Sequence, residues 1–186
     1  MDRQPVLEGG LLLLRPLRPE DWAALQAIAS DPQVWELHPE SGRWREPALS
    51  AYFAALINGK GTLAVTEKTT GALIGVSRYQ YGSQADGGTI EIGSTMLARS
   101  HWGGEANREM KRLMIAHALQ HVATVEFWAW QDNARSCRAL EKIGARLTER
   151  VEDVEIDGRI FPHAVFAITA ESFATGPLSP SGSASA

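Results

Sequence analysis

The sequence contains one cysteine among 186 residues, which excludes a disulfide within the chain. It has no apolar run approaching the roughly 20 residues that a membrane-spanning helix needs. Its 18 basic residues are scattered and outnumbered by 22 acidic ones, so the composition indicates neither nucleic-acid binding nor a membrane-surface patch. The first residues show no signal-peptide pattern. We therefore expect a cytoplasmic protein that binds neither nucleic acid nor membrane.

What is present is sufficient for one hydrophobic core. Apolar residues make up 44% of a chain whose length is close to that of one domain. Residues 1–173 are predicted to form that single domain. Serine, glycine, proline and alanine dominate residues 174–186, which we expect to be a disordered tail.

The periodicity of apolar residues predicts a mixed α/β order of elements. Strands are predicted within residues 6–17, 62–67, 72–81, 89–98, 125–130, 146–156 and 159–169. Helices are predicted over 19–31, 46–58 and 134–143, and a further one carries an apolar face from Ala106 to Ala118. Either Asp132 or Asn133 can cap the last helix, and the dipeptide Asp157-Gly158 is suited to a tight hairpin turn.

One stretch is more informative than the others. The strand segment Glu91–Leu97 is followed by Trp102–Asn107, a glycine turn that opens an amphipathic helix. Several backbone N–H groups at a helix start have no helical partner, and the helix dipole is positive there. The sequence therefore predicts a site for a phosphate or pyrophosphate, and hence a phosphate-bearing cofactor.

Two segments resemble a known family. They are Trp102-Gly103-x-x-x-Asn107-x-Glu109-x-Lys111 and Asn133-x-x-Ser136-x-x-Ala139-Leu140-Glu141-Lys142-Ile143-Gly144-Ala145. Together with the order of elements over Val6–Phe173, they resemble the GNAT superfamily of N-acetyltransferases, in particular its RimJ/RimL-like branch. The resemblance implies an α/β (α+β) fold. Its mixed, mostly antiparallel twisted sheet would have about seven strands, the fourth and fifth splayed apart, and about four helices would cover it.

The resemblance implies acetyl-CoA as the donor and an amine as the acceptor, either a peptide N-terminus or a small molecule. The pyrophosphate would bind the backbone amides of Gly103, Gly104, Glu105, Ala106 and Asn107. The Glu105 side chain would then have to turn to solvent, because a carboxylate beside phosphate is unfavourable. The pantetheine arm would lie along Thr95, Met96 and Leu97, and Asn133 would cap its helix or hold the arm.

Gly93 lies within this strand and has two interpretations. It is consistent with a bulge that opens the gap between the splayed strands, or with close packing of two backbones.

Direct attack by an amine requires oxyanion donors and a proton source for the departing thiolate. Backbone N–H groups near Met96 are the predicted oxyanion donors. Many superfamily members carry a tyrosine as proton source where this chain has Leu140, whereas RimL-like members carry a serine that matches Ser136. Ser136 is therefore assigned as proton donor to sulfur, although a first-turn serine can instead bond the local backbone. Glu91 could accept the amine proton, directly or through water, or be an ordinary solvated strand residue.

Other residues have structural explanations. His117 and His121 are four residues apart on one helix, but a third metal ligand is not evident and we expect no metal. Cys137 is predicted to be a core residue rather than a nucleophile, and Trp128 and Trp130 to be core rather than acyl-pocket residues.

The competing function is a non-catalytic acyl-CoA-binding or sensory module with the same fold. A homodimer is possible.

Overall fold

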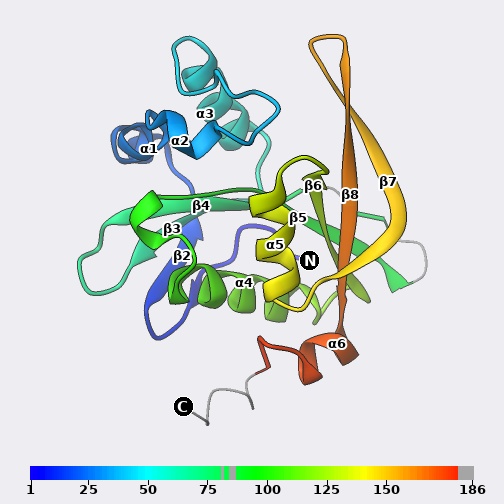
Figure 1. Ribbon diagram of the computed structural model, residues 1–186. Helices are drawn as coiled ribbons and strands as arrows, with labels where there is room; N and C mark the ends of the chain where they lie inside the picture. The colour runs from blue at the N-terminus through cyan, green and yellow to red at the C-terminus, as the bar shows by residue number, and fades with distance from the viewer. Residues whose placement is uncertain (81, 84–86, 180–186) are drawn as a thin grey trace. The chain divides into compact units, whose positions relative to one another are not determined.

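The computed structural model describes residues 1–80, 82–83 and 87–179, and Figure 1 shows its elements. The chain divides into two compact units. Unit 1 comprises Met1–Gln80 and Ile92–Met114, and unit 2 comprises Tyr81–Glu91 and Ile115–Ala186. Among the described residues, no helix has both the length and the apolar character that crossing a membrane requires.

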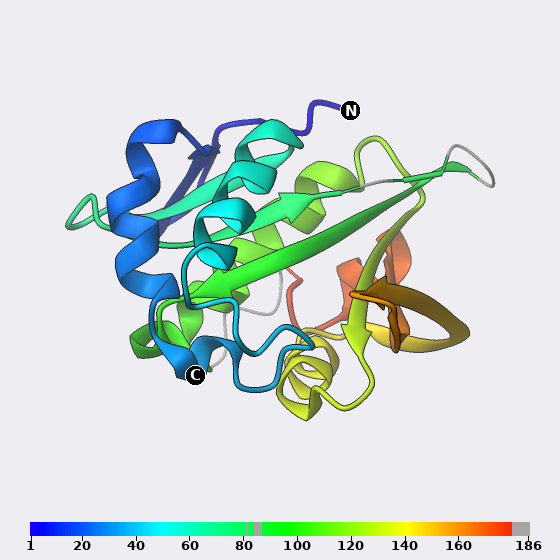
Figure 2. The same cartoon turned by 90° about the horizontal axis from the view of Figure 1, so that it is seen from above.

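Unit 1 is a sheet with helices on both faces. Its strands are β1 (Leu7–Glu8), β2 (Leu12–Pro16), β3 (Thr62–Glu67), β4 (Leu73–Tyr79) and the later part of β5 (Thr89–Leu97). Its helices are η1 (Pro19–Asp21), α1 (Trp22–Ala29), α2 (Pro32–Trp35), α3 (Ala48–Asn58), η3 (Arg99–His101) and most of α4 (Glu105–Ala118). Neighbouring strands are antiparallel. Helices α1 to α3 cover one face and α4 covers the other, as Figures 1 and 2 show.

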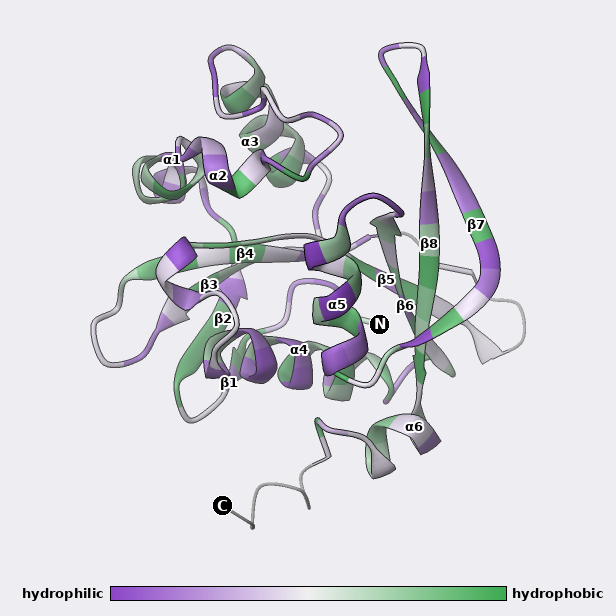
Figure 3. Ribbon diagram, in the orientation of Figure 1, coloured by the Kyte–Doolittle hydropathy of each residue, from purple (hydrophilic) through white to green (hydrophobic). Residues whose placement is uncertain are grey.

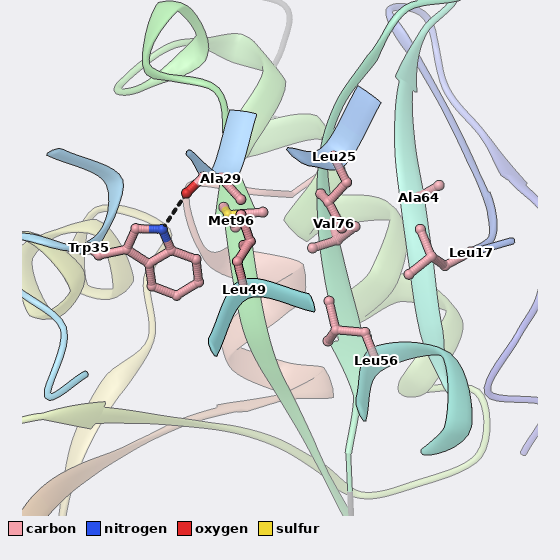
Figure 4. Close-up of a cluster of buried hydrophobic side chains, with 9 residues drawn as sticks. All are labelled: Leu17, Leu25, Ala29, Trp35, Leu49, Leu56, Ala64, Val76 and Met96. Carbon is pink, nitrogen blue, oxygen red and sulfur yellow. Dashed lines mark hydrogen bonds between the residues drawn. The ribbon is translucent and has the colours of Figure 1, made fainter. Parts of the chain in front are cut away.

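The core beneath α1 to α3 joins one buried residue from each of three strands to the helices. Ala64, Val76 and Met96 come from three adjacent strands and pack against apolar side chains of the helices (Figure 4). Trp35, which is 3% exposed, donates its indole N–H to the carbonyl of Ala29 at 2.7 Å. The connection between α2 and α3 is thus anchored in the core at Trp35, the last residue of α2.

The predicted N-terminal strand is in fact two strands. β1 and β2 pair across a turn at Gly9 and Gly10. The Glu109 carboxylate of α4 accepts hydrogen bonds from the backbone N–H groups of Gly10, Leu11 and Leu12, at 2.8, 2.8 and 2.7 Å. A side chain almost one hundred residues away therefore satisfies the backbone N–H groups of the turn. Local periodicity in the sequence could not indicate this long-range contact.

Unit 2 joins a parallel strand pair to a long hairpin. It contains the start of β5, β6 (Thr124–Trp130), α5 (Ala134–Lys142), β7 (Arg146–Ile156), β8 (Arg159–Thr169) and α6 (Ala170–Thr175). β5 pairs with β6 in parallel only over Thr89–Glu91 and Thr124–Glu126, the short pairing expected of strands that splay. The predicted hairpin turn is confirmed, since Asp157 and Gly158 both have positive φ, 49° and 74°. Figure 3 shows hydrophilic and hydrophobic bands alternating along β7.

In hydrogen-bonding order the strands of the described chain run β1-β2-β3-β4-β5-β6-β8-β7. All pairs are antiparallel except β5 with β6. The mixed, mostly antiparallel sheet is therefore confirmed, with eight strands rather than about seven. The additional strand arises from the divided N-terminal run. The short helices α2 and α6 were not predicted.

The expected disordered tail needs correction where it meets unit 2. Helix α6 continues to Thr175, and Leu178 is only 3% exposed. Pro177 packs against Gly144, at 2.6 Å from the position that a Cβ would take there. Residues 174–179 are therefore held by packing, and the rest of the expected tail, 180–186, lies outside the described residues, as does Tyr81 at the end of a predicted strand.

We expect Asp21→Asn to lower the free energy of unfolding by about 1–2 kcal/mol at pH 7. Arg15 donates two hydrogen bonds to Asp21, at 2.8 and 2.7 Å, and the Arg18 N–H donates a third at 2.9 Å. Burial raises the pKa of Asp21, but these donors outweigh it and the pKa lies below its ordinary 3.8. A depressed pKa stabilises the fold above the unfolded-state value and is lost as pH falls through the folded-state value.

The difference between wild type and variant should therefore shrink below about pH 4 in urea unfolding. The exposed neighbour Glu20 provides a control, since Glu20→Gln should change the free energy of unfolding by less than about 0.5 kcal/mol. A difference that stayed constant down to pH 3.5 would contradict the assigned ion pair.

Candidate functional site

The glycine turn in unit 1 leads directly into α4. Gly103 has a φ of +70°, and a Cβ placed on Gly103 or Gly104 would meet no other atom within 4 Å. The helix begins at Glu105, whose side chain is exposed, while Ala106 and Asn107 are half-buried. The first N–H groups of a helix have no intrahelical acceptor. The turn thus combines open space with a helix N-terminus, whose backbone donors and positive dipole end suit an anion.

The end of β5 is fixed to the same region. The indole N–H of Trp102 donates to the carbonyl of Leu97 at 2.9 Å. Gly75 of β4 lies so close to Met96 that a side chain there would overlap the Met96 carbonyl oxygen. Met96 and Leu97 are buried, whereas Thr95 is exposed. Of the three predicted pantetheine contacts, Thr95 is therefore the one whose side chain a ligand can reach.

The sequence placed a possible bulge at Gly93, but the irregular residue is Ser94. The register of β4 with β5 shifts between Val76 and Arg78, and Ser94 has a φ of +45°, whereas Gly93 is not in the left-handed region. The Ser94 side chain lies beside Tyr52 of α3. Burial raises the pKa of Tyr52, and nearby arginines and Ser94 partly oppose that shift. A tertiary contact thus accompanies the strained position.

A buried cation lies on the other face of β5. Lys111 of α4 is 5% exposed, and its Nζ donates to Thr95 Oγ1 at 2.8 Å. Thr95 Oγ1 is also 2.8 Å from Ser77 Oγ on β4, which is completely buried. Lys111 was noted only as part of the family motif. Its approach to Thr95 required the structure.

In unit 2, Asn133 and Ser136 come together at the start of α5. The side-chain oxygen of Asn133 accepts from the backbone N–H of Ser136 at 3.0 Å. Of the two residues that the sequence offered as the N-cap, Asp132 and Asn133, the cap is therefore Asn133. Asn133 is 9% exposed and Ser136 is half-buried. Within the described part of the chain, the Ser136 hydroxyl makes no hydrogen bond to local backbone. The hydroxyl is therefore not committed to the backbone of its own helix.

Glu91 has a second carboxylate beside it. Its register partner on β6 is Glu126, so the two side chains leave the same face of the strand pair. The Glu126 side chain, 10% exposed, forms an ion pair with Arg150 at 2.6 Å and accepts from the indole N–H of Trp128 at 3.3 Å. Arg150 also contacts Glu152 at 2.6 Å. In the sequence Glu126 is the one charged residue in the predicted strand 125–130, and nothing there signals its pairing with Arg150.

The remaining polar and aromatic candidates, His117, His121, Cys137 and Trp130, have packing contacts or burial that fit structural roles. The rings of His117 and His121 lie edge to face, 5.4 Å apart, and no group of three or more potential metal ligands occurs among the described residues. Burial raises the pKa of the Cys137 thiol, which disfavours the thiolate that a nucleophile needs. Trp130 packs edge to face on Phe161.

Comparison with known proteins agrees with these features. The profile of the acetyltransferase (GNAT) domain family matches residues 12–146. Many solved structures share the fold, and three of them illustrate the similarity. A GCN5-related N-acetyltransferase from Brucella melitensis is 23% identical, with a TM-score of 0.75 over 91% of this chain and 80% of its own. A GNAT-family acetyltransferase from Bacillus anthracis is 19% identical, with a TM-score of 0.69 over 90% and 99%. RimJ from Mycobacterium smegmatis, in complex with CoA-disulfide, is 22% identical, with a TM-score of 0.66 over 91% and 87%.

Proposed function

Because the chain belongs to the GNAT acetyltransferase family, whose members use acetyl-CoA, we propose that it transfers acetyl to a primary amine by direct attack. The observation that carries the proposal is the turn before α4. Gly103 and Gly104 leave open space at a helix start whose backbone donors suit a pyrophosphate. The exposed side chain of Glu105 can turn to solvent, which removes the conflict between its carboxylate and a phosphate.

The residues proposed to bind the donor lie in two groups. Backbone amides from Gly103 to Asn107 would hold the pyrophosphate, and Thr95, Met96 and Leu97 would contact the pantetheine arm. The side chain of Asn133 is already engaged as a helix cap, which fixes α5 and the orientation of its first turn. Acetyl-CoA supplies an activated thioester when bound, and the chain supplies positioning and proton transfer.

Two side chains would move protons. Ser136 would donate its hydroxyl proton to the departing sulfur, because its hydroxyl is not used by the local backbone within the described structure. Glu91 would accept the amine proton, directly or through water. Neighbouring Glu126 forms an ion pair with Arg150, so its charge is balanced within the protein. A backbone N–H near Met96 would stabilise the oxyanion.

The acceptor is proposed from the motifs. The segments around Asn107 and Asn133 resemble the RimJ/RimL-like branch, which favours a peptide N-terminus over a small-molecule amine. We place the reaction in the cytoplasm, in keeping with a chain that has a single cysteine. The acidic composition does not indicate a nucleic-acid partner.

The first experiment is calorimetric titration of the purified protein with acetyl-CoA, followed by a screen of peptides and small amines for acetyl transfer. Saturable one-to-one binding with turnover is the expected result. Binding without turnover on any amine would select the non-catalytic acyl-CoA-binding module instead. Absence of binding at high micromolar concentration would overturn both. Sedimentation equilibrium on the same preparation tests the possible homodimer.

A further inference from the structure

The hydrogen bonds around Thr95 have a definite direction. Lys111 Nζ has only protons to offer, so Thr95 Oγ1 must accept from it. The second bond joins Thr95 Oγ1 to Ser77 Oγ, and either hydroxyl could supply the proton. Which one does so decides where the Thr95 proton points.

Burial of Ser77 settles the direction. Ser77 is 0% exposed, and Thr95 is the partner of its hydroxyl in the part of the chain that the structure describes. If Thr95 donated to Ser77, the Ser77 proton would be buried without an acceptor, a cost of about 1–3 kcal/mol. The favoured arrangement therefore has Ser77 and Lys111 both donating to Thr95.

Thr95 then keeps its own proton for an outside acceptor. The residue is exposed although Met96 and Leu97, which follow it on β5, are buried. A hydroxyl that accepts from an ammonium group is polarised, and it becomes a stronger donor in turn. The fold thus holds a polarised donor at an exposed point of the strand that we assign to the acyl-pantetheine arm.

We propose that the Thr95 hydroxyl, oriented by Lys111 and Ser77, donates a hydrogen bond to a carbonyl oxygen of the acyl-pantetheine arm. Lys111 acts as a positioning residue, since its Nζ donates to Thr95 Oγ1. The proposal rests on the proposed function, because it requires that the protein bind acyl-CoA. It adds a side-chain contact and a buried cation to the backbone contacts expected of β5.

Binding measurements test this without any acceptor. Thr95→Val removes the hydroxyl at nearly constant shape, and it should weaken acetyl-CoA binding about 10-fold, whereas Thr95→Ser should stay within about 2-fold of wild type. Lys111→Met should weaken binding about 5-fold. The double variant should bind no more weakly than Thr95→Val alone, because both changes remove one contact.

Two controls separate this contact from charge and folding effects. Adenosine 3′,5′-bisphosphate lacks the pantetheine arm, so its affinity should be unchanged in every variant. Arg112→Met removes a positive charge one residue along α4 from Lys111 and should leave acetyl-CoA affinity unaltered. Thr95→Val deprives Ser77 and Lys111 of their acceptor, whereas Thr95→Ser keeps the hydroxyl, so the comparison of these two variants, each checked by thermal unfolding, remains a test even if Lys111→Met fails to fold.

The outcomes are distinguishable. An equal loss for acetyl-CoA and CoA supports donation to an amide carbonyl of the arm, and a loss for acetyl-CoA alone supports donation to the thioester carbonyl. Unchanged affinity in Thr95→Val, with wild-type binding intact, overturns the inference and leaves the proposed function standing. An equal loss for the bisphosphate overturns it too. Failure of the wild type to bind acetyl-CoA overturns the proposed function itself.

Discussion

Gly103→Asp is expected to weaken acetyl-CoA binding about 30-fold. An aspartate there would place a carboxylate where we assign the pyrophosphate, and two like charges about 6–8 Å apart at a partly exposed site repel by about 2 kcal/mol. Space is not the obstacle, because a Cβ at this position meets nothing within 4 Å. Calorimetric titration with acetyl-CoA gives the affinity directly.

The matched control is Gly103→Asn. Asparagine has nearly the same size as aspartate and pays a similar cost for the φ of +70°, but it carries no charge. Its affinity for acetyl-CoA should stay within about 3-fold of wild type. The gap between the two variants should narrow at high salt, since screening weakens repulsion at an exposed site. Equal affinities of both variants and wild type would contradict the assignment of the pyrophosphate to this turn.

Ser136→Ala is expected to lower kcat about 100-fold while changing acetyl-CoA affinity less than about 3-fold. Loss of a proton donor to the leaving thiolate affects the chemical step, and general acid catalysis contributes factors of this size. The substitution preserves the helix start, because Asn133 is bonded to the Ser136 backbone N–H and not to its hydroxyl. Steady-state and single-turnover kinetics on the best amine measure both quantities.

Cys137→Ala provides the comparison on the same helix. Its thiol is adjacent in sequence and the only one in the chain, and its pKa is raised by burial. We expect kcat of this variant to stay within about 2-fold of wild type. If Ser136→Ala retains full kcat with chemistry shown to be rate-limiting, Ser136 has no part in the mechanism. A large loss in Cys137→Ala would shift attention to the thiol.

Elements defined by local periodicity were predictable from the sequence. Helix α4, strand β6 and the Asp157-Gly158 turn needed only apolar spacing and turn chemistry. The cap of α5 was narrowed to two residues, and the structure selected Asn133. These features depend on residues a few positions apart, which is the range over which sequence patterns are informative.

Features that depend on distant partners could not be predicted. The backbone donors of the turn between β1 and β2 are satisfied by Glu109. The left-handed conformation in β5 falls on Ser94, beside Tyr52 of α3, rather than on the nearby Gly93. Among candidate site residues, Glu126 depends on Arg150, which is 24 positions away. Lys111 was visible as a motif residue, but its partner Thr95 lies on a different element. Such pairs become apparent only when the chain is folded.

The strand order also bears on how the protein avoids aggregation through the edges of its sheet. Strands at the end of a sheet expose unpaired backbone groups to which other chains can add. In unit 1 the final strand, β1, has only two residues, and Glu8 forms an ion pair with Lys68 at 2.7 Å. In unit 2 the final strand, β7, is long but carries charged side chains at Glu149, Arg150, Glu152, Asp153 and Glu155. Each unit thus carries its own protection against edge-to-edge aggregation, one by brevity and the other by charge.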